Sequence, residues 1–391
     1  MLIFTLAATL SITPALIPAQ ASPSHIPDRY IVILNDDSNP WSVANEMAEE
    51  RGLAVSHVYG NAVNGFSAIV PRGQLDNVAS DPRVNYIEQD SVVSIYKKPN
   101  DKPGNGGNDA TEDSLPPQTI PTGISLIHAT TTGTVDVNVA VIDTGIDENH
   151  PDLNVVDGVN FVFRGKNTFD DGHGHGTHVA GTIGAIDNAQ GVIGVAPGAN
   201  LYSVRVLDNS GSGTYSGVIA GIDWVAANAE TIDVANMSLG GGASQAINQA
   251  VESAVAAGVV FVVAAGNENT DACTKSPASA PSAITVSALD DRNGILGNND
   301  SFASFSNSGS CVDMIAPGVL IESTWKGGGY NTISGTSMAS PHVAGAAALY
   351  IANDSNLTPA QVTQALINDG IYSWNNSADD DDTQEPLLDL S

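Results

Sequence analysis

Basic side chains are scarce in this sequence. Its 391 residues include 13 Lys and Arg against 43 Asp and Glu, which gives a formal net charge of −30 at pH 7. A phosphate backbone would be repelled by such a chain, so we expect no nucleic-acid partner. Beyond the N-terminus no apolar run reaches about 18 residues, so we expect no membrane partner either. The acidic balance is instead typical of a solubilising surface outside the cell.

Cysteine is also nearly absent, because the sequence contains only Cys273 and Cys311. In an exported protein such a pair is more often a disulfide than a metal site, with two free thiols as the alternative. Export is indicated by residues 2–18, which are uncharged and mostly apolar and precede a small-x-small cleavage pattern at residues 19–21. This arrangement predicts a signal peptide over residues 1–21 and a secreted protein.

Three further zones differ in composition. Residues 22–96 alternate between extended and helical patterns, which predicts a small α+β domain. The patterns lie at residues 29–34, 41–51, 66–70, 74–80 and 84–87. Residues 97–120 are polar and rich in Pro and Gly, so we predict an exposed linker that contains the processing region.

Residues 121–372 alternate between short apolar runs and amphipathic or Ala-rich stretches, which predicts a parallel sheet covered by helices on both faces. The expected strands are residues 137–143, 201–207, 234–238, 259–264 and 284–288. The expected helices are residues 175–185, 215–229, 244–257, 338–351 and 359–369. In such α/β sheets, functional side chains lie where strands end and helices begin. Residues 373–391 form an acidic tail that we expect to be solvated and mobile.

Three short segments carry candidate chemistry. In residues 335–339 (GTSMA) a strand-like run gives way to an Ala-rich helix at Ser337. A hydroxyl there is exposed and close to a helix N-terminus that favours developing negative charge, as a nucleophile requires. A serine at this position is, however, more commonly an N-cap residue.

The second segment, residues 173–181 (HGHGTHVAG), contains three histidines among small residues. It suits a general base at a helix start, a zinc site or a buried structural histidine. The zinc peptidase pattern requires a glutamate after the first histidine and another histidine four residues along, and neither is present. The third segment, residues 139–145 (VAVIDTG), ends an apolar strand in Asp143. Aspartic proteases use two such carboxylates, but only one copy is found, and the alternative is a carboxylate that caps the next turn.

Taken together, Asp143, His175 and Ser337 supply an orienting carboxylate, a base and a nucleophile in the chain order known from subtilisin. The motifs VIDTGID (141–147), HGTHVAGT (175–182) and GTSMASPHVAG (335–345) resemble those of the subtilisin-like serine proteases, and within them the proteinase K-like and aqualysin-like group. The resemblance covers the predicted catalytic domain, and residues 22–96 resemble the inhibitory propeptide of the family. It implies a three-layer, doubly wound, mostly parallel α/β sheet preceded by a ferredoxin-like α+β propeptide.

The resemblance also assigns roles. It makes His175, the first histidine of His-Gly-Thr-His, the base, so His178 and His342 are expected to be structural, while His173 falls outside the motif. It points to Asn267 as a donor to the oxyanion, alongside the backbone N–H of Ser337. A loop asparagine that tolerates an awkward turn is the alternative.

Substrate should be held by backbone, because glycine-rich edges let a peptide add as a strand with little sequence demand. The resemblance places one edge at Ser238, Leu239, Gly240 and Gly241, and the other at Gly211, Ser212 and Gly213. The first side-chain pocket is expected between residues 238–241 and the segment Ala264, Ala265 and Gly266. Because these residues are small and uncharged, we predict an apolar or aromatic side chain before the scissile bond.

No cofactor is expected for catalysis, but the resemblance implies a structural calcium held by carbonyl oxygens of Pro281 and Ala283 and by the carboxylate of Asp313. A surface aspartate is the alternative. The resemblance also pairs Cys273 with Cys311 in a disulfide. The sequence therefore predicts a monomeric secreted serine endopeptidase that acts on proteins and peptides and is inhibited by its own propeptide until it cuts itself. The rival interpretation is an inactive binding protein on a protease scaffold.

Overall fold

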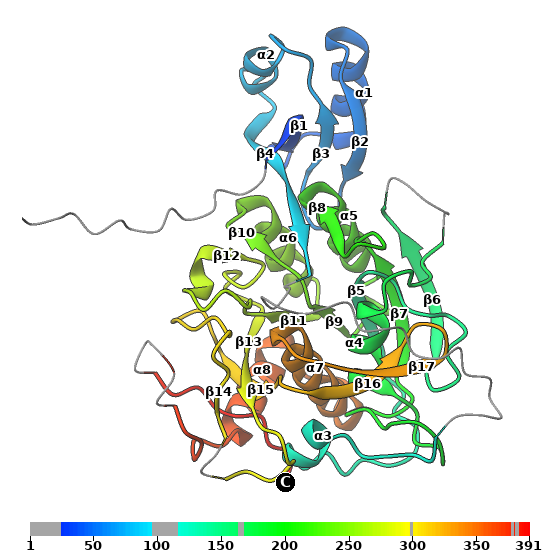
Figure 1. Cartoon of the computed structure of the whole chain (residues 1–391). Helices are drawn as coiled ribbons and strands as arrows, with labels where there is room; N and C mark the ends of the chain where they lie inside the picture. Colours follow the sequence, from blue (N-terminus) through cyan, green and yellow to red (C-terminus); the bar gives the residue numbers. More distant parts are fainter. Residues whose placement is uncertain (1–24, 96–115, 163–167, 298–299, 377–378, 380–382) are drawn as a thin grey trace, which may run out of the picture.

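The computed structural model describes residues 25–95, 116–162, 168–297, 300–376, 379 and 383–391 (Figure 1). The predicted signal peptide, most of the predicted linker and Asp380 to Asp382 lie outside these residues. Residues 25–95 form the domain at the top of Figure 1, in which two helices pack on an antiparallel sheet of strand order β2-β3-β1-β4. Its elements are β1 (His25–Leu34), α1 (Pro40–Arg51), β2 (Ala54–Tyr59), β3 (Gly65–Ile69), α2 (Leu75–Ala79) and β4 (Val84–Ser94).

The larger domain is built on a mostly parallel sheet with strand order β14-β13-β11-β9-β5-β7-β6, in which β15 also pairs with β13. Within the described residues, only the β13–β14 pair of this sheet is antiparallel. Its strands are β5 (Asn138–Asp143), β6 (Val155–Asn160), β7 (Asn200–Arg205), β9 (Val234–Met237), β11 (Val260–Ala264), β13 (Ile284–Asp290), β14 (Ser301–Phe302) and β15 (Met314–Pro317). Shorter pairs are formed by β8 (Ser212–Thr214) with β4, by β10 (Gly241–Gly242) with β12 (Lys275–Ser276), and by β16 (Ile321–Trp325) with β17 (Gly329–Ile333).

Helices cover both faces of this sheet. Successive residues of a strand point to opposite faces, and since both sets are apolar here, both faces must be covered. In β5, Val139 and Val141 pack on the face covered by α4 and α7, whereas Ala140 and Ile142 pack on the face covered by α5 and α6. The three-layer α/β architecture expected from the continuous apolar strands is therefore confirmed. The helices are α3 (Thr122–Leu126), α4 (His175–Gly184), α5 (Tyr215–Ala227), α6 (Gln245–Ala256), α7 (Thr336–Asn353) and α8 (Pro359–Asp369), with a 3₁₀ turn at Ala272–Thr274.

The expectation of a solvated tail is wrong for residues 383–391. This segment adds to the outer edge of β15, where the N–H of Ile315 donates to Pro386 O (3.0 Å) and the N–H of Leu388 donates to Ile315 O (2.9 Å). Leu387 and Leu388 are each 1% exposed, and Leu387 packs in a cluster with Trp374 and Ile315. Two adjacent leucines after the Asp-rich stretch thus bury apolar surface that composition alone does not reveal.

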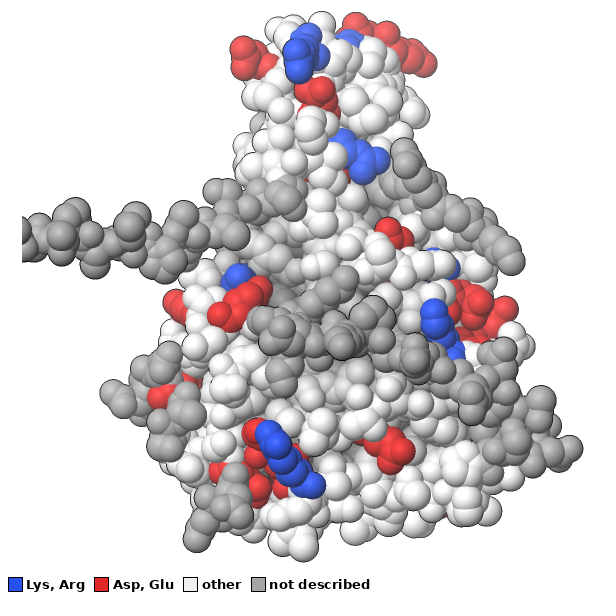
Figure 2. All heavy atoms as spheres, in the orientation of Figure 1, with Lys and Arg blue, Asp and Glu red and all other residues white. Residues whose placement is uncertain are grey.

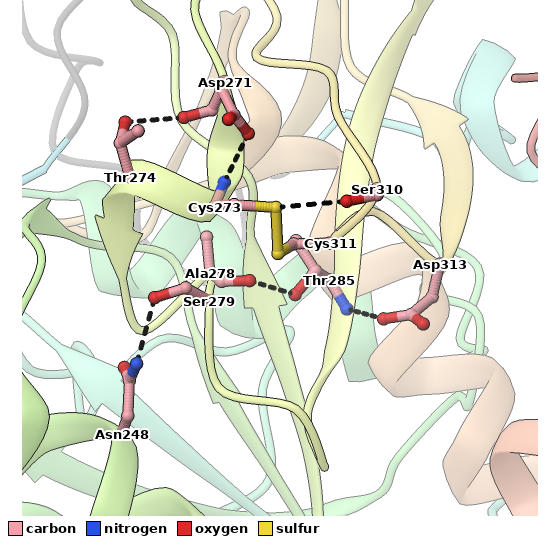
Figure 3. Close-up of a disulfide and its surroundings, with 10 residues drawn as sticks. All are labelled: Asn248, Asp271, Cys273, Thr274, Ala278, Ser279, Thr285, Ser310, Cys311 and Asp313. Carbon is pink, nitrogen blue, oxygen red and sulfur yellow. Dashed lines mark hydrogen bonds between the residues drawn. A yellow bond between two sulfur atoms is a disulfide. The ribbon is translucent and has the colours of Figure 1, made fainter. Parts of the chain in front are cut away.

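Cys273 and Cys311 form a disulfide with Cα atoms 5.3 Å apart (Figure 3). It joins the 3₁₀ turn after β11 to the loop between β14 and β15. Among the described residues, no helix has the length and apolar character to cross a membrane.

Candidate active site

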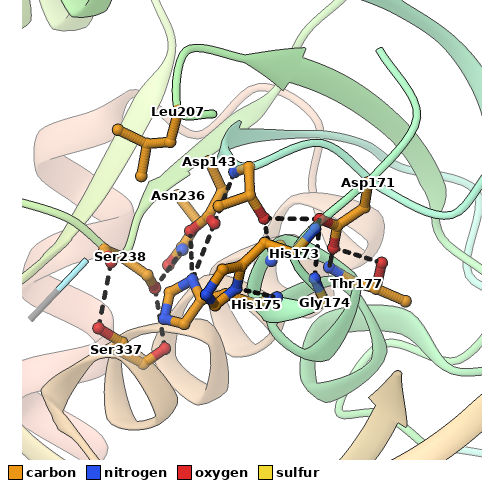
Figure 4. A network of polar contacts seen from close by, with 12 residues as sticks. Asp143, Asp171, His173, Gly174, His175, Thr177, Leu207, Asn236, Ser238 and Ser337 are labelled. Carbon is orange, nitrogen blue, oxygen red and sulfur yellow. Dashed lines mark hydrogen bonds and ion pairs between the residues drawn. The ribbon is translucent and has the colours of Figure 1, made fainter. Parts of the chain in front are cut away.

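Asp143 and His175 meet where β5 ends and α4 begins (Figure 4). The imidazole Nδ1 lies 2.8 Å from Oδ1 and 3.0 Å from Oδ2 of Asp143, and the two residues are 0% and 5% exposed. Because a carboxylate only accepts hydrogen bonds, Nδ1 carries the proton and Nε2 is left as the basic nitrogen when the ring is neutral. The pair therefore has the geometry of a base held by an orienting carboxylate.

Glycines allow this close approach. A Cβ on Gly176 would lie 2.1 Å from the backbone oxygen of Gly145, so a side chain there would push the start of α4 away from the end of β5. Gly145 itself has φ of +107°, in the region that L side chains rarely adopt. The small residues that surround both motifs are thus required by the packing of the site.

Ser337 is the second residue of α7 and is 1% exposed. Pro341, four residues later, has no N–H, so it cannot donate the helical hydrogen bond to the carbonyl of Ser337. The hydroxyl of Ser238 lies 2.8 Å from that carbonyl and donates in its place. In turn the Ser337 hydroxyl donates to the carbonyl of Ser238 (3.1 Å), and the ring of His175 lies beside it in Figure 4. The three predicted residues are thus brought together from β5, α4 and α7.

Asn267 follows β11 and lies beside the start of α7. Its Oδ1 accepts from both the N–H (2.9 Å) and the hydroxyl (2.8 Å) of Thr336. These two donors fix the orientation of the amide, so Nδ2 lies on the side of the amide group away from them. A Cβ on Gly335 would lie 3.0 Å from that nitrogen, which explains why a glycine precedes Thr336.

The other histidines of the motifs are neutral and structural, as expected. Burial lowers the pKa of His178 to about 3 and that of His342 to about 4. Both rings donate to backbone, His178 Nε2 to Ile321 O (3.0 Å) and His342 Nδ1 to Met338 O (2.8 Å). No group of three or more His, Cys, Asp or Glu in the described part of the chain could hold a metal ion, which argues against the zinc alternative.

His173 lies beside the pair. Its Nδ1 accepts from the backbone N–H of His175 (3.3 Å), and burial lowers the pKa of its ring. Nε2 of His173 lies 3.6 Å from the position of a Cβ on Gly211. It therefore lines the space between the base and one predicted substrate edge, although the sequence left its role open.

The two predicted substrate edges are occupied by the end of β4. Val92, Val93 and Ser94 pair antiparallel with Thr214, Gly213 and Ser212 of β8. On the same side, the N–H of Ile95 donates to Gly211 O (3.0 Å). On the other side, Ser94 and Gly240 each donate a backbone N–H to the other's carbonyl, with N to O distances of 3.4 and 3.2 Å. The N-terminal domain thus runs a strand between the two edges, and Figure 1 shows β4 descending into the larger domain.

The predicted first pocket contains an acidic neighbour that the sequence reasoning missed. Ala264 and Ala265 are fully buried, but a Cβ on Gly266 would lie 2.7 Å from Oε2 of Glu268. Glu268 is engaged by Lys275 Nζ (3.1 Å) and by Asn307 Nδ2 (3.0 Å). The sequence offered one indication of a role for Glu268, its position directly after Asn267. That its side chain lies beside Gly266 depends on the fold and could not be predicted from the sequence.

Carboxylates join the N-terminal domain to the helices of the larger one. Asp223 of α5 accepts from the backbone N–H groups of Gly60 (3.1 Å), Asn61 (2.7 Å) and Ala62 (2.8 Å). Two further contacts have the carboxylate on the N-terminal domain and the donor at a helix start. Asp90 of β4 accepts from the N–H and hydroxyl of Ser216, and Glu88 of β4 accepts from the N–H of Ala246. Helix N-termini favour negative charge, so these contacts seat the domain on α5 and α6.

Comparisons with known proteins agree with this architecture. Residues 134–386 match the subtilase family (Peptidase_S8), and residues 29–96 match peptidase inhibitor I9. The alkaline serine exoprotease A of Vibrio alginolyticus is 44% identical over 376 residues, 93% of this chain and 66% of that protein. Subtilisin E of Bacillus subtilis (strain 168) is 40% identical over 387 residues, 96% of this chain and 93% of that protein. The crystal structure of a cold adapted subtilisin-like serine proteinase is 47% identical with a TM-score of 0.59, and the match covers 67% of this chain and 92% of that one.

A parallel α/β sheet that carries a buried Asp–His pair beside a serine, together with these matches, defines a serine endopeptidase. The chain belongs to the subtilase family and carries an N-terminal inhibitor I9 propeptide domain.

Proposed function

We propose that this protein is a secreted, broad-specificity endopeptidase in which Asp143, His175 and Ser337 form the catalytic triad. The observation that carries the proposal is the contact between Nδ1 of His175 and the carboxylate of Asp143, made next to the hydroxyl of Ser337. Nε2 of His175 takes the proton of Ser337 as its oxygen attacks the peptide carbonyl, and later gives it to the leaving amine. The negative charge that develops on the carbonyl oxygen is stabilised by the N–H of Ser337 and by Nδ2 of Asn267.

The same site would process the precursor. Residues 92–95 already lie between the edges at 211–214 and 240, as a peptide substrate would. The next residue in the sequence, Tyr96, has the aromatic side chain that we predict for the first pocket. We therefore expect cleavage after Tyr96, with the propeptide remaining bound as an inhibitor until it is degraded. The predicted signal peptide would direct the precursor out of the cell.

Ser337→Ala tests the triad and the processing together. The variant should fold and remain a full-length precursor, whereas the parent should yield a mature chain that starts at Lys97 by mass spectrometry. Casein hydrolysis by the parent should be abolished by phenylmethylsulfonyl fluoride. Normal processing of the Ser337→Ala variant, or activity that survives the serine reagent, would contradict the proposal.

Structural calcium remains part of the proposal. Asp313 directly precedes β15, and its Oδ2 accepts from the N–H of Thr285 at the start of β13 (2.8 Å; Figure 3). Burial raises the pKa of its carboxyl to about 6. A carboxylate together with backbone carbonyls is a donor set that suits a hard cation. Asp313, with the carbonyls of Pro281 and Ala283, would hold the ion, whose role is to stabilise the fold rather than to take part in the chemistry.

A further inference from the structure

A buried carboxylate that the reaction itself does not use lies against the triad. Asp171 precedes α4 and is 5% exposed (Figure 4). Its Oδ1 accepts from the N–H groups of His173 (2.8 Å) and Gly174 (2.9 Å) and from the hydroxyl of Thr144 (2.9 Å). Its Oδ2 accepts from the N–H (3.0 Å) and the hydroxyl (2.7 Å) of Thr177. All these donors are neutral, and they lie on both sides of His175 and next to Asp143.

Thr144 links this carboxylate to both members of the Asp143–His175 pair. Its N–H donates to Oδ1 of Asp143 (2.7 Å), which fixes the rotation of that carboxylate. Its hydroxyl donates to Asp171 and accepts from the N–H of Gly176, the residue after the base (2.9 Å). A single fully buried hydroxyl therefore spans the gap between the end of β5 and the start of α4.

The spacing between these two elements decides whether His175 can bridge Asp143 and Ser337. Unmade hydrogen bonds to buried groups are costly, and bonds to a charged acceptor are stronger than neutral ones, so the Asp171 network resists any shift of α4 relative to β5. Misplacement of a catalytic group by about 1 Å can cost about 100-fold in rate. The network therefore acts on the geometry of catalysis rather than on substrate binding.

We propose that Asp171 and Thr144 are positioning residues, which hold the imidazole of His175 on the carboxylate of Asp143 through a shared hydrogen-bond network. The inference rests on the proposed triad. It differs from a general contribution to stability because the donors belong to residues that flank the triad. Asp152 provides a contrast: it is fully buried and accepts from Val192, Asn188 and Tyr330, none of which flanks Asp143, His175 or Ser337.

The test compares Thr144→Val, which removes the hydroxyl at nearly constant volume, with Thr144→Ser, which keeps it. Active sites of the mature enzymes are counted by titration, and kcat and KM are measured on a short peptide with an aromatic residue before the cut. Thr144→Val should lower kcat about 10- to 100-fold with KM within about threefold of the parent, and Thr144→Ser should stay within about threefold in both. The rate of self-processing should fall by a similar factor, and in Asp171→Asn at least as far, because an amide offers only one acceptor oxygen.

Asp152→Asn is the matched control, which should lower the melting temperature but leave kcat per active site unchanged. A parent-like kcat in Thr144→Val, a Thr144→Ser variant as slow as Thr144→Val, or an equal loss of kcat in Asp152→Asn would overturn the inference. If Thr144→Val does not fold, Thr144→Ala gives the same comparison without an added methyl group. Failure of the triad itself appears separately, as parent activity that phenylmethylsulfonyl fluoride does not inhibit.

Discussion

At the scale of single residues, Asn267 illustrates how the proposed oxyanion donor is oriented before any substrate arrives. Its carbonyl oxygen is fixed by two donors of Thr336, so its amide nitrogen needs no rearrangement when charge develops. A donor that is fixed in advance stabilises the transition state more than it stabilises the bound substrate.

Asn267→Ala should therefore lower kcat with little change in KM. Loss of one such donor from a subtilisin costs about 100- to 1,000-fold in kcat, and we expect a loss of similar size here. Steady-state kinetics on a short peptide substrate would measure both constants. Asn307→Ala, which alters an asparagine bonded to Glu268 and Ala265 outside the start of α7, serves as a comparison for general disturbance of this loop. A mainly KM defect in Asn267→Ala would argue against the oxyanion role.

Glu268 leads to a prediction about specificity. Its carboxylate lies near the predicted first pocket but is paired with Lys275. Lys275→Gln should remove the cationic partner of that charge and raise kcat/KM for a peptide with Lys before the cut by about two- to fivefold relative to one with Phe, because a partly exposed ion pair is worth up to about 1 kcal/mol. The double variant Lys275→Gln/Glu268→Gln should return to the preference of the parent, and a gain that persists in it would show that Glu268 is not responsible.

The sequence predicted the residues with strong local signals and missed those defined by distant partners. Asp143, His175 and Ser337 stand at strand or helix ends within motifs, so their proximity could be anticipated. Asp171 and Asp223 look like ordinary aspartates, because their importance lies in donors that the fold brings from other segments. Sequence periodicity cannot report such long-range partners.

At the scale of elements, the same distinction applies to strands. The buried parallel strands β5, β7, β9, β11 and β13 were predicted because both of their faces are apolar, whereas the four-residue β15 was not predicted. β2 was not, because its AVSHVY sequence lies partly exposed between α1 and β3, and the β16–β17 hairpin was not, because a polar, Gly-rich turn joins its strands. The 383–391 segment escaped notice for a related reason, since its short apolar run follows four aspartates.

That segment should contribute to stability. Leu387→Ala removes a side chain that is 1% exposed against Trp374 and Ile315, which typically costs about 2–4 kcal/mol of unfolding free energy. For a domain of this size we expect the melting temperature to fall by about 5–10 °C. The measurement is best made in the Ser337→Ala background, where self-digestion cannot contribute. Tyr372→Ala is the control, because Tyr372 is 52% exposed and nearby in sequence; equal melting temperatures for both variants would mean that the segment is not held by this contact.

Asp313 gives a pH-dependent prediction. Burial raises the folded-state pKa of Asp313 from 3.8 to about 6. In the absence of a cation, ionisation of this carboxyl therefore lowers the folding stability, and the loss grows as the pH rises from about 4 to 6. Calcium would offset this loss, so the rise in melting temperature caused by calcium should be full above pH 6 and lost by about pH 4. Scanning calorimetry with calcium and with a chelator measures this difference. Asp313→Asn should abolish the calcium effect at pH 8 and, in chelator, be at least as stable as the parent; a calcium effect that survives the substitution would place the ion elsewhere.

At the scale of the whole molecule, the two domains are joined in three ways: by a strand in the predicted substrate groove, by carboxylates at helix starts, and by an apolar cluster that β1 shares with α5 and α6. Figure 2 shows few Lys and Arg side chains over the face in view. At the domain junction, backbone N–H groups of the inhibitor domain converge on Asp223, with a further bond from Asn61 Nδ2 (3.0 Å). The groove contacts resemble those of any substrate strand, whereas the Asp223 contacts require the folded loop at residues 60–62 and so distinguish the inhibitor from a peptide.

Asp223→Ala should therefore weaken inhibition without changing catalysis. Truncating one side of a buried, hydrogen-bonded charge typically costs 2–5 kcal/mol, which would raise the inhibition constant of added propeptide by at least about tenfold. The propeptide, residues 22–96, is titrated into mature enzyme, and residual activity on a short peptide gives the inhibition constant, while kcat and KM should match the parent. Glu252→Ala is the control, because Glu252 of α6 accepts from Ser282 and not from the inhibitor domain. If both variants are inhibited as tightly as the parent, the Asp223 contacts do not determine affinity, and the loop at residues 60–62 does not select the inhibitor through them.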